Sequence, residues 1–225
     1  LVPIRLELEW EMYKLRDTFT WNLAETAITP QIFASHLCAD FRLPREPFER
    51  EIVNAVQKQL TEAQLSASYT DHLADRLMPL KDFSNPSDEL RLVIKLDITL
   101  DSIQLVDQFE WDISDLNNSP EAFAEAFAAE LGLTGEFVTA ISHSIREQID
   151  FYTRSLCILG YAPGRGIADE ELRRDFLPPL QEPFRTDTAD DFTPALNQLA
   201  AEEVERHDRE HEREIRRKRR QTKGR

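Results

Sequence analysis

The histidines near the C-terminal end of the chain have a spacing that could bind a metal ion. His207, Glu210 and His211 fit the pattern H-x-x-E-H, in which two histidines one helical turn apart can share a zinc ion. A catalytic zinc also needs further ligands and a shaped cavity that restricts water. Here no third ligand is evident, the flanking sequence is polar, and five basic side chains follow closely. We therefore expect two surface histidines, with no metal and no cofactor.

Two aspartates are the next candidates, because each lies in phase with apolar residues. The segments LRDTFTW (15–21) and LVDQFEW (105–111) place Leu, Asp, Phe and Trp at alternate positions, so a strand would turn all four side chains to one face. Each aspartate could be a catalytic acid, or could accept main-chain N–H bonds within a hairpin. Neither has a histidine or a second carboxylate at a telling spacing, which favours the structural interpretation. The motif residues are Leu15, Asp17, Phe19, Trp21, Leu105, Asp107, Phe109 and Trp111.

Other signs of enzymatic chemistry are absent from the sequence. It contains no P-loop, no strand-linked G-x-G-x-x-G and no G-x-S-x-G motif. Cys38 and Cys157 are far apart and have no C-x-x-C partner, which is typical of ordinary thiols in a reducing compartment. The longest apolar runs are too short to span a membrane. The sequence therefore shows no catalytic motif beyond the histidine pair, and it predicts no membrane segment.

Charge is distributed unevenly along the chain. The formal net charge is −15, yet residues 215–225 contain seven Lys or Arg and no acid. An acidic body with a basic end suggests a tail that meets an anionic partner. The cluster could be a solvated run or nuclear import signal, a contact to nucleic-acid phosphates, or a rigid helix whose guanidinium groups pair with a carboxylate-rich protein surface. Its residues are Arg216, Arg217, Lys218, Arg219 and Arg220.

The duplicated motif organises the expected fold. Its copies lie 90 residues apart in the numbering, and the match extends over roughly 60 positions, which indicates a repeat. In each copy two alternating segments predict an antiparallel hairpin, and Thr29-Pro30 or Ser119-Pro120 marks a helix start. A second helix follows, with an apolar residue at every fourth position from Phe48 or Phe137. The sequence predicts an α+β fold of tandem ββαα repeats, with a helix end at Gly132.

The chain does not begin with Met, which suggests a piece of a longer protein. Within it we expect five regions. Residues 1–62 form the first repeat, 63–90 a linker with one short helix at most, and 91–152 the second repeat. Residues 153–192 form a mostly irregular extension, in which the apolar run 155–161 is a strand or a packed extension. Residues 193–225 form a long, solvent-exposed helix with a basic end, since Thr193-Pro194 is typical of a helix start.

Several segments resemble a known family. VPIRLELE, KLRDTFTW, LVDQFEWD, SPEAFA, GEFVTAI, SIREQI and REIRRKRR together resemble the Snf-five (integrase interactor one) family, the core subunit shared by SWI/SNF and RSC chromatin-remodelling complexes. Segments 67–90 and 160–191 are similar to those of fungal members. The resemblance implies a nuclear, non-catalytic scaffold whose repeats dock SWIRM-domain scaffold subunits, in two copies. It implies only indirect contact with the ATPase module of the remodeller.

The resemblance also implies a role for the basic end, as a helix that binds the acidic patch of the histone octamer. By position, the anchor residues are Arg213, Arg216, Arg217, Arg219 and Arg220, and Lys218 stands where animal members have an apolar residue. The alternative function is a nucleic-acid-binding adaptor whose basic tail contacts DNA or RNA phosphates. The two functions differ in whether the anionic partner is a histone surface or a nucleic acid.

Overall fold

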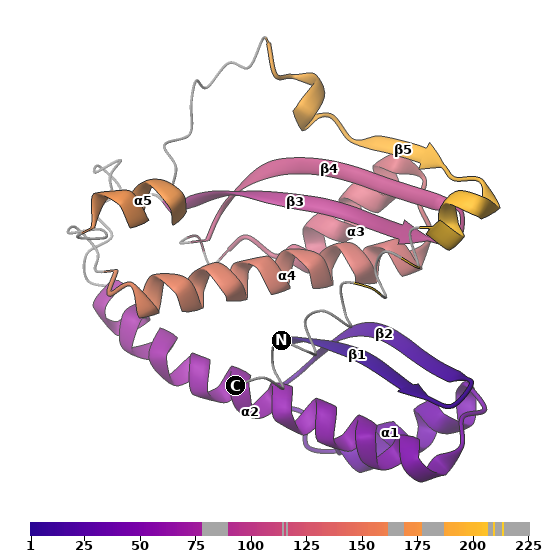
Figure 1. The fold of residues 1–225 in the computed structure, drawn as a ribbon. Helices are drawn as coiled ribbons and strands as arrows, with labels where there is room; N and C mark the ends of the chain where they lie inside the picture. The colour runs from indigo at the N-terminus through magenta and orange to yellow at the C-terminus, as the bar shows by residue number, and fades with distance from the viewer. Residues whose placement is uncertain are drawn as a thin grey trace. The chain divides into compact units, whose positions relative to one another are not determined.

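The computed structural model describes residues 1–77, 90–113, 115, 117–161, 169–176, 187–206, 209 and 213. In this part of the chain the fold is mixed α/β, with two small antiparallel sheets (Figure 1). The chain divides into two compact units: Leu1–Ile94 with Glu110–Pro183, and Lys95–Phe109 with Phe184–Arg225. None of the described helices is both long enough and apolar enough to cross a membrane.

A two-stranded hairpin begins the chain. Strand β1, Val2–Trp10, pairs antiparallel with β2, Tyr13–Trp21, and Trp10 lies opposite Tyr13 across the loop. Ile4 and Leu6 on one face of β1 are fully buried, as a period of two requires. Glu11, the first loop residue, has a φ of 52°, the positive value that tight hairpin turns need to match strand twist. The turn therefore forms without the Asn-Gly pair that most often makes it.

Two helices follow the first hairpin. Helix α1, Pro30–Asp40, begins as predicted, because Thr29 Oγ1 accepts a hydrogen bond from the N–H of Ile32 at 3.3 Å. Helix α2, Arg45–Leu77, packs on α1 and β1 and has non-helical torsion angles only near its start, at Glu46. It continues far into the segment expected to be a linker. Because no Pro or Gly occurs between residues 48 and 77, nothing in the sequence stops the helix from propagating.

Residues 91–158, here called the second segment, contain two strands and two helices in the same order as residues 2–77, the first segment. Strand β3, Arg91–Leu100, neighbours β4, Ile103–Asp112, and Asp101 in their loop has a φ of 52°. Helix α3, Pro120–Leu131, begins with Ser119 Oγ accepting from the N–H of Ala122 at 3.3 Å. It ends at Gly132 with a φ of 67°, as predicted. Helix α4, Gly135–Ile158, completes the segment.

The end of α4 corrects one expectation. The run 155–161 was expected to form a strand or a packed extension, but α4 continues to Ile158. Leu156 in this run is 4 % exposed and packs with Leu90 and Tyr161. The N–H of Tyr161 bonds the carbonyl of Leu156 at 3.0 Å, and Gly160 has a φ of 67°. The run therefore contains the last turn of a helix, which buries Leu156, leaves Ile158 exposed and is closed by a left-handed glycine.

A third strand replaces the predicted start of the C-terminal helix. Strand β5, Ala195–Gln198, pairs antiparallel with β4 and gives the sheet order β3-β4-β5 (Figure 1). The prediction of a helix from Thr193 is wrong, since Ala195–Gln198, which would form its first turn, is a strand paired with β4. The edge of β4 offers main-chain groups that this segment satisfies, and the N–H of Leu199 extends the pairing to the carbonyl of Ser102 at 2.8 Å. Described helical residues follow at 201–206, 209 and 213.

Two short elements lie within the segment expected to be mostly irregular. Helix α5 spans Glu170–Phe176, and a 3-10 helix, η3, spans Asp190–Phe192. Residues 162–168 and 177–186 lie outside the described part of the chain. The expected domain boundaries stay a prediction.

Candidate interaction site

Most motif residues of both hairpins lie toward a buried face. Leu15, Trp21, Leu105 and Trp111 are buried, and Phe19 and Phe109 are half-buried. Each tryptophan meets a phenylalanine of the following helix edge-on: the ring centroids of Trp21 and Phe33 are 5.5 Å apart, and those of Trp111 and Phe123 are 5.6 Å apart. These aromatic residues therefore make core contacts that fix each hairpin on its helices.

The two aspartates of the motif each bond the next residue of their own strand. Asp17 Oδ1 accepts from the N–H of Thr18 at 2.9 Å, and the carboxylate of Asp107 accepts from the N–H of Gln108. Burial raises the pKa of both carboxyl groups, and these N–H bonds oppose that rise. Asp107 is 8 % exposed, and its Oδ1 has no hydrogen-bond partner among the described residues. The choice between a structural and a catalytic role for these carboxylates stays a prediction.

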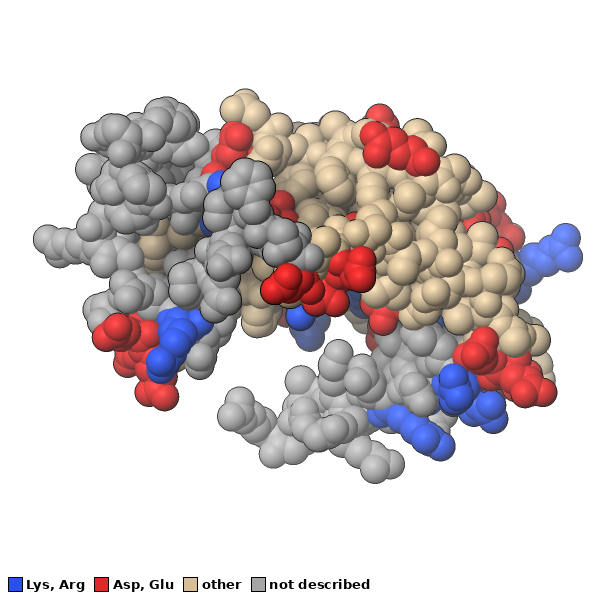
Figure 2. Space-filling view, turned by 90° about the horizontal axis from the view of Figure 1, so that it is seen from above, with Lys and Arg blue, Asp and Glu red and all other residues tan. Residues whose placement is uncertain are grey.

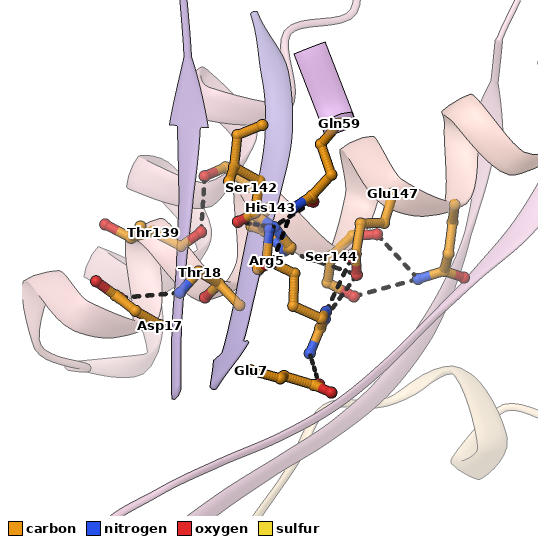
Figure 3. A network of polar contacts seen from close by, with 12 residues as sticks. Arg5, Glu7, Asp17, Thr18, Gln59, Thr139, Ser142, His143, Ser144 and Glu147 are labelled. Atoms are coloured by element: carbon orange, nitrogen blue, oxygen red, sulfur yellow. Dashed lines mark hydrogen bonds and ion pairs between the residues drawn. The ribbon is translucent and has the colours of Figure 1, made fainter. Parts of the chain in front are cut away.

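A polar network joins the first hairpin to α4 (Figure 3). Arg5 Nε donates to Glu147 Oε1 at 3.0 Å, and Arg5 Nη2 donates to Glu147 Oε2 at 2.7 Å, as two parallel bonds. By strand alternation, Arg5 projects from the face of β1 opposite to Ile4 and Leu6. Helix α4 contacts both β1 and β2. Both side chains of the pair are partly exposed, so water weakens its contribution to stability.

Gln59 of α2 takes the place of a neighbouring strand beside Arg5. Its Oε1 accepts from the main-chain N–H of Arg5 at 2.9 Å, and its Nε2 donates to the main-chain carbonyl of Arg5 at 3.0 Å (Figure 3). The Nε2 also donates to the carbonyl of Ala55 at 3.1 Å. An edge strand otherwise exposes these main-chain groups. The outer edge of β1 is therefore closed at Arg5 by a side chain.

His143 is the buried member of the network. It is 1 % exposed, and its Nε2 lies 3.0 Å from the carbonyl oxygen of Ile4. Because a carbonyl oxygen can only accept, Nε2 carries the proton in this contact. Burial lowers the pKa of His143, and this outweighs the nearby carboxylate of Glu147, whose Oε2 lies 3.6 Å from Nδ1. His143 is thus a neutral donor that ties α4 to the main chain of β1.

The sequence interpretation missed this network. Arg5, Gln59, His143 and Glu147 carry no motif, and each is unremarkable in its own segment. One signal of the network appears when the sequences of α2 and α4 are aligned. His143 and Glu147 stand where α2 has the exposed residues Asn54 and Lys58. A change from Lys to Glu on one helix face, beside a histidine, indicates that this face has different neighbours.

The predicted basic site lies mostly outside the described residues. Arg213 is helical and exposed, and Arg209 pairs with Glu205 one helical turn before it, with Nη2 3.8 Å from Oε2. Arg216, Arg217, Lys218, Arg219 and Arg220 lie outside the described part of the chain, as do His207, Glu210 and His211. On the face that Figure 2 presents, the basic side chains of the described residues occur in small groups beside acidic ones rather than as one broad patch.

Comparison with known proteins identifies relatives along almost the whole chain. The family described as SNF5 / SMARCB1 / INI1 matches residues 1–216. The chain is 38% identical over 245 residues to the SWI/SNF chromatin-remodeling complex subunit snf5 of Schizosaccharomyces pombe, and 43% identical over 230 residues to SNF5 of Saccharomyces cerevisiae. Each match covers 98% of this chain but 39% and 24%, respectively, of the relative.

A more distant relative belongs to a second complex. The chromatin structure-remodeling complex subunit SFH1 of Saccharomyces cerevisiae is 28% identical over 235 residues, covering 99% of this chain and 48% of the relative. The chain therefore spans less than half the length of each of these three curated relatives. Since the family match extends through both hairpins and the described C-terminal residues, this chain belongs to the SNF5 / SMARCB1 / INI1 family.

Proposed function

We propose that this chain is a non-catalytic scaffold subunit of an ATP-dependent chromatin-remodelling complex in the nucleus. The match of residues 1–216 to the SNF5 / SMARCB1 / INI1 family carries the proposal, together with relatives that are named as subunits of chromatin-remodelling complexes. The ATPase activity of such a complex then belongs to another subunit, which this chain meets only indirectly. The described contacts of the chain are those of core packing and of polar junctions, which suit a scaffold.

The two hairpin–helix segments are proposed to be tandem repeats, at 1–62 and 91–152, that each dock one SWIRM domain of a paired scaffold subunit. The order β1-β2-α1-α2 recurs as β3-β4-α3-α4. Glu11 and Asp101 have the same φ of 52° in equivalent loops. The helix caps Thr29 and Ser119 occupy equivalent positions and make equivalent bonds. Two copies of one surface suit two copies of one partner.

The basic C-terminal segment is proposed to bind the acidic patch of the histone octamer. Its anchors are Arg213, Arg216, Arg217, Lys218, Arg219 and Arg220. Arg213 is exposed on a helix, and in a helical continuation the spacing of residues 213, 216, 217 and 220 would place four arginines on one face. Guanidinium groups on one face can form paired bonds with clustered carboxylates.

A second candidate function is the binding of DNA or RNA phosphates by the same segment. The observation that favours it is the run of seven Lys or Arg without an acid in residues 215–225. Such a run binds phosphates without sequence preference and with a steep dependence on salt. The two candidates therefore predict different partners for the same arginines.

Binding of the chain to reconstituted nucleosomes separates the two candidates. We would compare wild-type nucleosomes with nucleosomes whose acidic-patch carboxylates are changed to amides, and test the chain with Arg216, Arg217, Arg219 and Arg220 changed to Ala. The control is Lys223→Ala with Arg225→Ala, which removes two charges outside the proposed anchors. Neutralising the patch should weaken binding as strongly as the fourfold substitution does. If the neutralised patch leaves the affinity unchanged while the fourfold substitution abolishes binding, the histone assignment is wrong.

A further inference from the structure

The chain passes from β5 into helical residues with a very short connection. Strand β5 ends at Gln198 and the described helical residues begin at Ala201, so only Leu199 and Ala200 lie between them. The N–H of Leu199 donates to the carbonyl of Ser102, in the loop of the second hairpin, at 2.8 Å. The start of the helical residues is therefore held within two residues of a main-chain bond to that loop.

The first helical turn is closed by its own residues. The N–H of Ala200 donates to Glu203 Oε2 at 2.9 Å, and the carbonyl of Ala200 accepts from the N–H groups of Glu203 and Val204 at 2.9 and 3.1 Å. A glutamate that reaches back to the residue before the helix is half of a capping box. The turn can thus form by itself, and β5 with Leu199 ties it to the second hairpin.

Strand β5 is attached to β4 by hydrogen bonds rather than by an apolar core. All four of its residues are exposed. Beside the main-chain pairing, Asn197 Nδ2 donates to Gln104 Oε1 at 3.3 Å, and Gln198 Nε2 donates to Ser102 Oγ at 2.7 Å. A strand with little buried apolar surface opens locally at a low free energy. The attachment of β5 is therefore sensitive to the loss of a single bond.

Gln104 specifies this attachment through both ends of its amide. Its Nε2 donates to Asp97 Oδ1 of β3 at 2.8 Å, while its Oε1 accepts from Asn197. The counterpart of Gln104 in the first hairpin, 90 residues earlier in the numbering, is Lys14. An ammonium group donates but cannot accept, so a lysine could not take the bond from Asn197. The amide at position 104 therefore favours the pairing of β5 with the second hairpin.

We propose that β5 is an anchor strand, which fixes the point from which the basic C-terminal segment extends and so positions its arginines for the histone acidic patch. The inference rests on the proposed function of that segment. An anchored segment has less conformational freedom to lose on binding than one that follows an unpaired chain, so anchoring raises affinity without a new contact. Gln104 and Asn197 are positioning residues in this account, since neither belongs to the basic segment.

The substitution Gln104→Lys tests the specificity of the anchor without a change in β5 or in any arginine. The lysine can still pair with Asp97 but cannot accept from Asn197, so amide hydrogen exchange at Asn197 and Leu199 in the full chain should become about fivefold faster. Adding Asn197→Asp supplies an acceptor for the lysine. The double variant should therefore restore slow exchange at Leu199.

The substitution Asn197→Pro tests whether the anchor affects binding. Bonded pairs alternate along an antiparallel ladder, so the N–H of Asn197 faces β4, as that of Leu199 does, whereas the N–H of Leu196 faces away. Proline at position 197 removes a ladder bond, and the matched control Leu196→Pro removes none. We expect Asn197→Pro, with every arginine intact, to weaken binding of the full chain to reconstituted nucleosomes by about tenfold. The control should change the affinity by less than about twofold.

The outcomes separate this inference from the proposed function. If Asn197→Pro speeds exchange at Leu199 but leaves nucleosome affinity unchanged, while the fourfold arginine substitution abolishes binding, the anchor is wrong and the role of the basic segment stands. If the fourfold arginine substitution also leaves binding unchanged, the proposed function fails too. Unchanged exchange at Leu199 in Asn197→Pro would equally overturn the anchor. Should the proline variant fail to fold, the anchor is overturned if Asn197→Asp does not restore slow exchange in Gln104→Lys.

Discussion

Helices α2 and α4 occupy equivalent places in the two segments, yet they bury different faces. Both bury an apolar stripe, with Ile52 on α2 and Ile141 on α4 each fully buried. On α2 the neighbouring face is exposed at Asn54. On α4 the equivalent residue is His143, which is 1 % exposed and bonds the main chain of β1. A helix with one apolar stripe can thus acquire a second contact through a few polar residues, provided that each is paired.

The largest effects are expected in the apolar stripes that the two helices share. Ile52→Ala and Ile141→Ala each remove a fully buried side chain, and each should lower the free energy of unfolding by about 2–5 kcal/mol. Urea denaturation of both variants measures this. A loss below about 1 kcal/mol in either variant would contradict the equivalence of the two stripes.

The substitution His143→Ala should measure how much the contact between α4 and β1 stabilises the fold. It leaves the carbonyl of Ile4 without its donor and opens space in a buried region, so we expect a loss of about 1–3 kcal/mol. The matched control Asn54→Ala, at the exposed equivalent on α2, should change the free energy of unfolding by less than about 0.5 kcal/mol. Equal losses of unfolding free energy in the two variants would show that the contact of His143 with β1 does not stabilise the fold.

The ends of the first helices offer a matched pair of backbone substitutions. Arg42 has a φ of 52° where the second segment has Gly132 with a φ of 67°. The N–H groups of Leu43 and Leu133 make equivalent bonds at 2.9 Å to the carbonyls of Cys38 and Ala128. Arg42→Gly should stabilise the chain, and Gly132→Arg should destabilise it, each by about 1 kcal/mol. Thermal unfolding of both variants provides the measurement, and shifts in the same direction would contradict the expectation.

The ion pair between Arg5 and Glu147 should contribute less. Both side chains are partly exposed, so a double-mutant cycle with Arg5→Gln and Glu147→Gln should give a coupling of about 1 kcal/mol or less. The coupling should fall as salt is raised. A control cycle on Arg154 and Asp150, which pair within α4 at 2.8 Å, measures the coupling energy of an ion pair whose two residues belong to the same helix.

A pH dependence should accompany the buried histidine. The folded state lowers the pKa of His143 from its ordinary value of 6.5, so the unfolded chain binds more protons just below that pH. Stability should therefore decrease as the pH falls below about 6.5, and this part of the dependence should disappear in His143→Gln. Urea midpoints between pH 5 and pH 8, compared for the two chains, test the sign. An unchanged profile in His143→Gln would mean that another group causes it.

Local rules predicted the parts of the fold that local chemistry determines. Thr29 and Ser119 cap their helices, and Gly132 ends α3, because each needs only its own side chain or backbone freedom. The alternating strands were predictable because their period identifies the buried face. The length of α2 was not predictable in this way. Its apolar periodicity fades before Leu77, and only the helix propensity of its residues continues to the end of the helix.

Partners distant in the sequence determined what local rules missed. Thr193-Pro194 satisfies the local conditions for a helix start, but the available edge of β4 captures the next residues as β5. The network of Arg5, Gln59 and His143 requires three elements to meet, and no spacing within one element encodes that meeting. No residue pattern within one segment indicates this network. Its one signal is the difference in sequence between α2 and α4.

The stoichiometry of partner binding tests the central functional claim most directly. If the two segments are repeats with equivalent docking surfaces, one chain should bind two isolated SWIRM domains of the scaffold subunit, and native mass spectrometry should resolve a complex of one chain with two domains. Substitutions at buried positions such as Ile141 would disturb folding, so the wild-type chain is the sample of choice. A complex that saturates with one SWIRM domain, or the absence of any complex, would contradict the proposal.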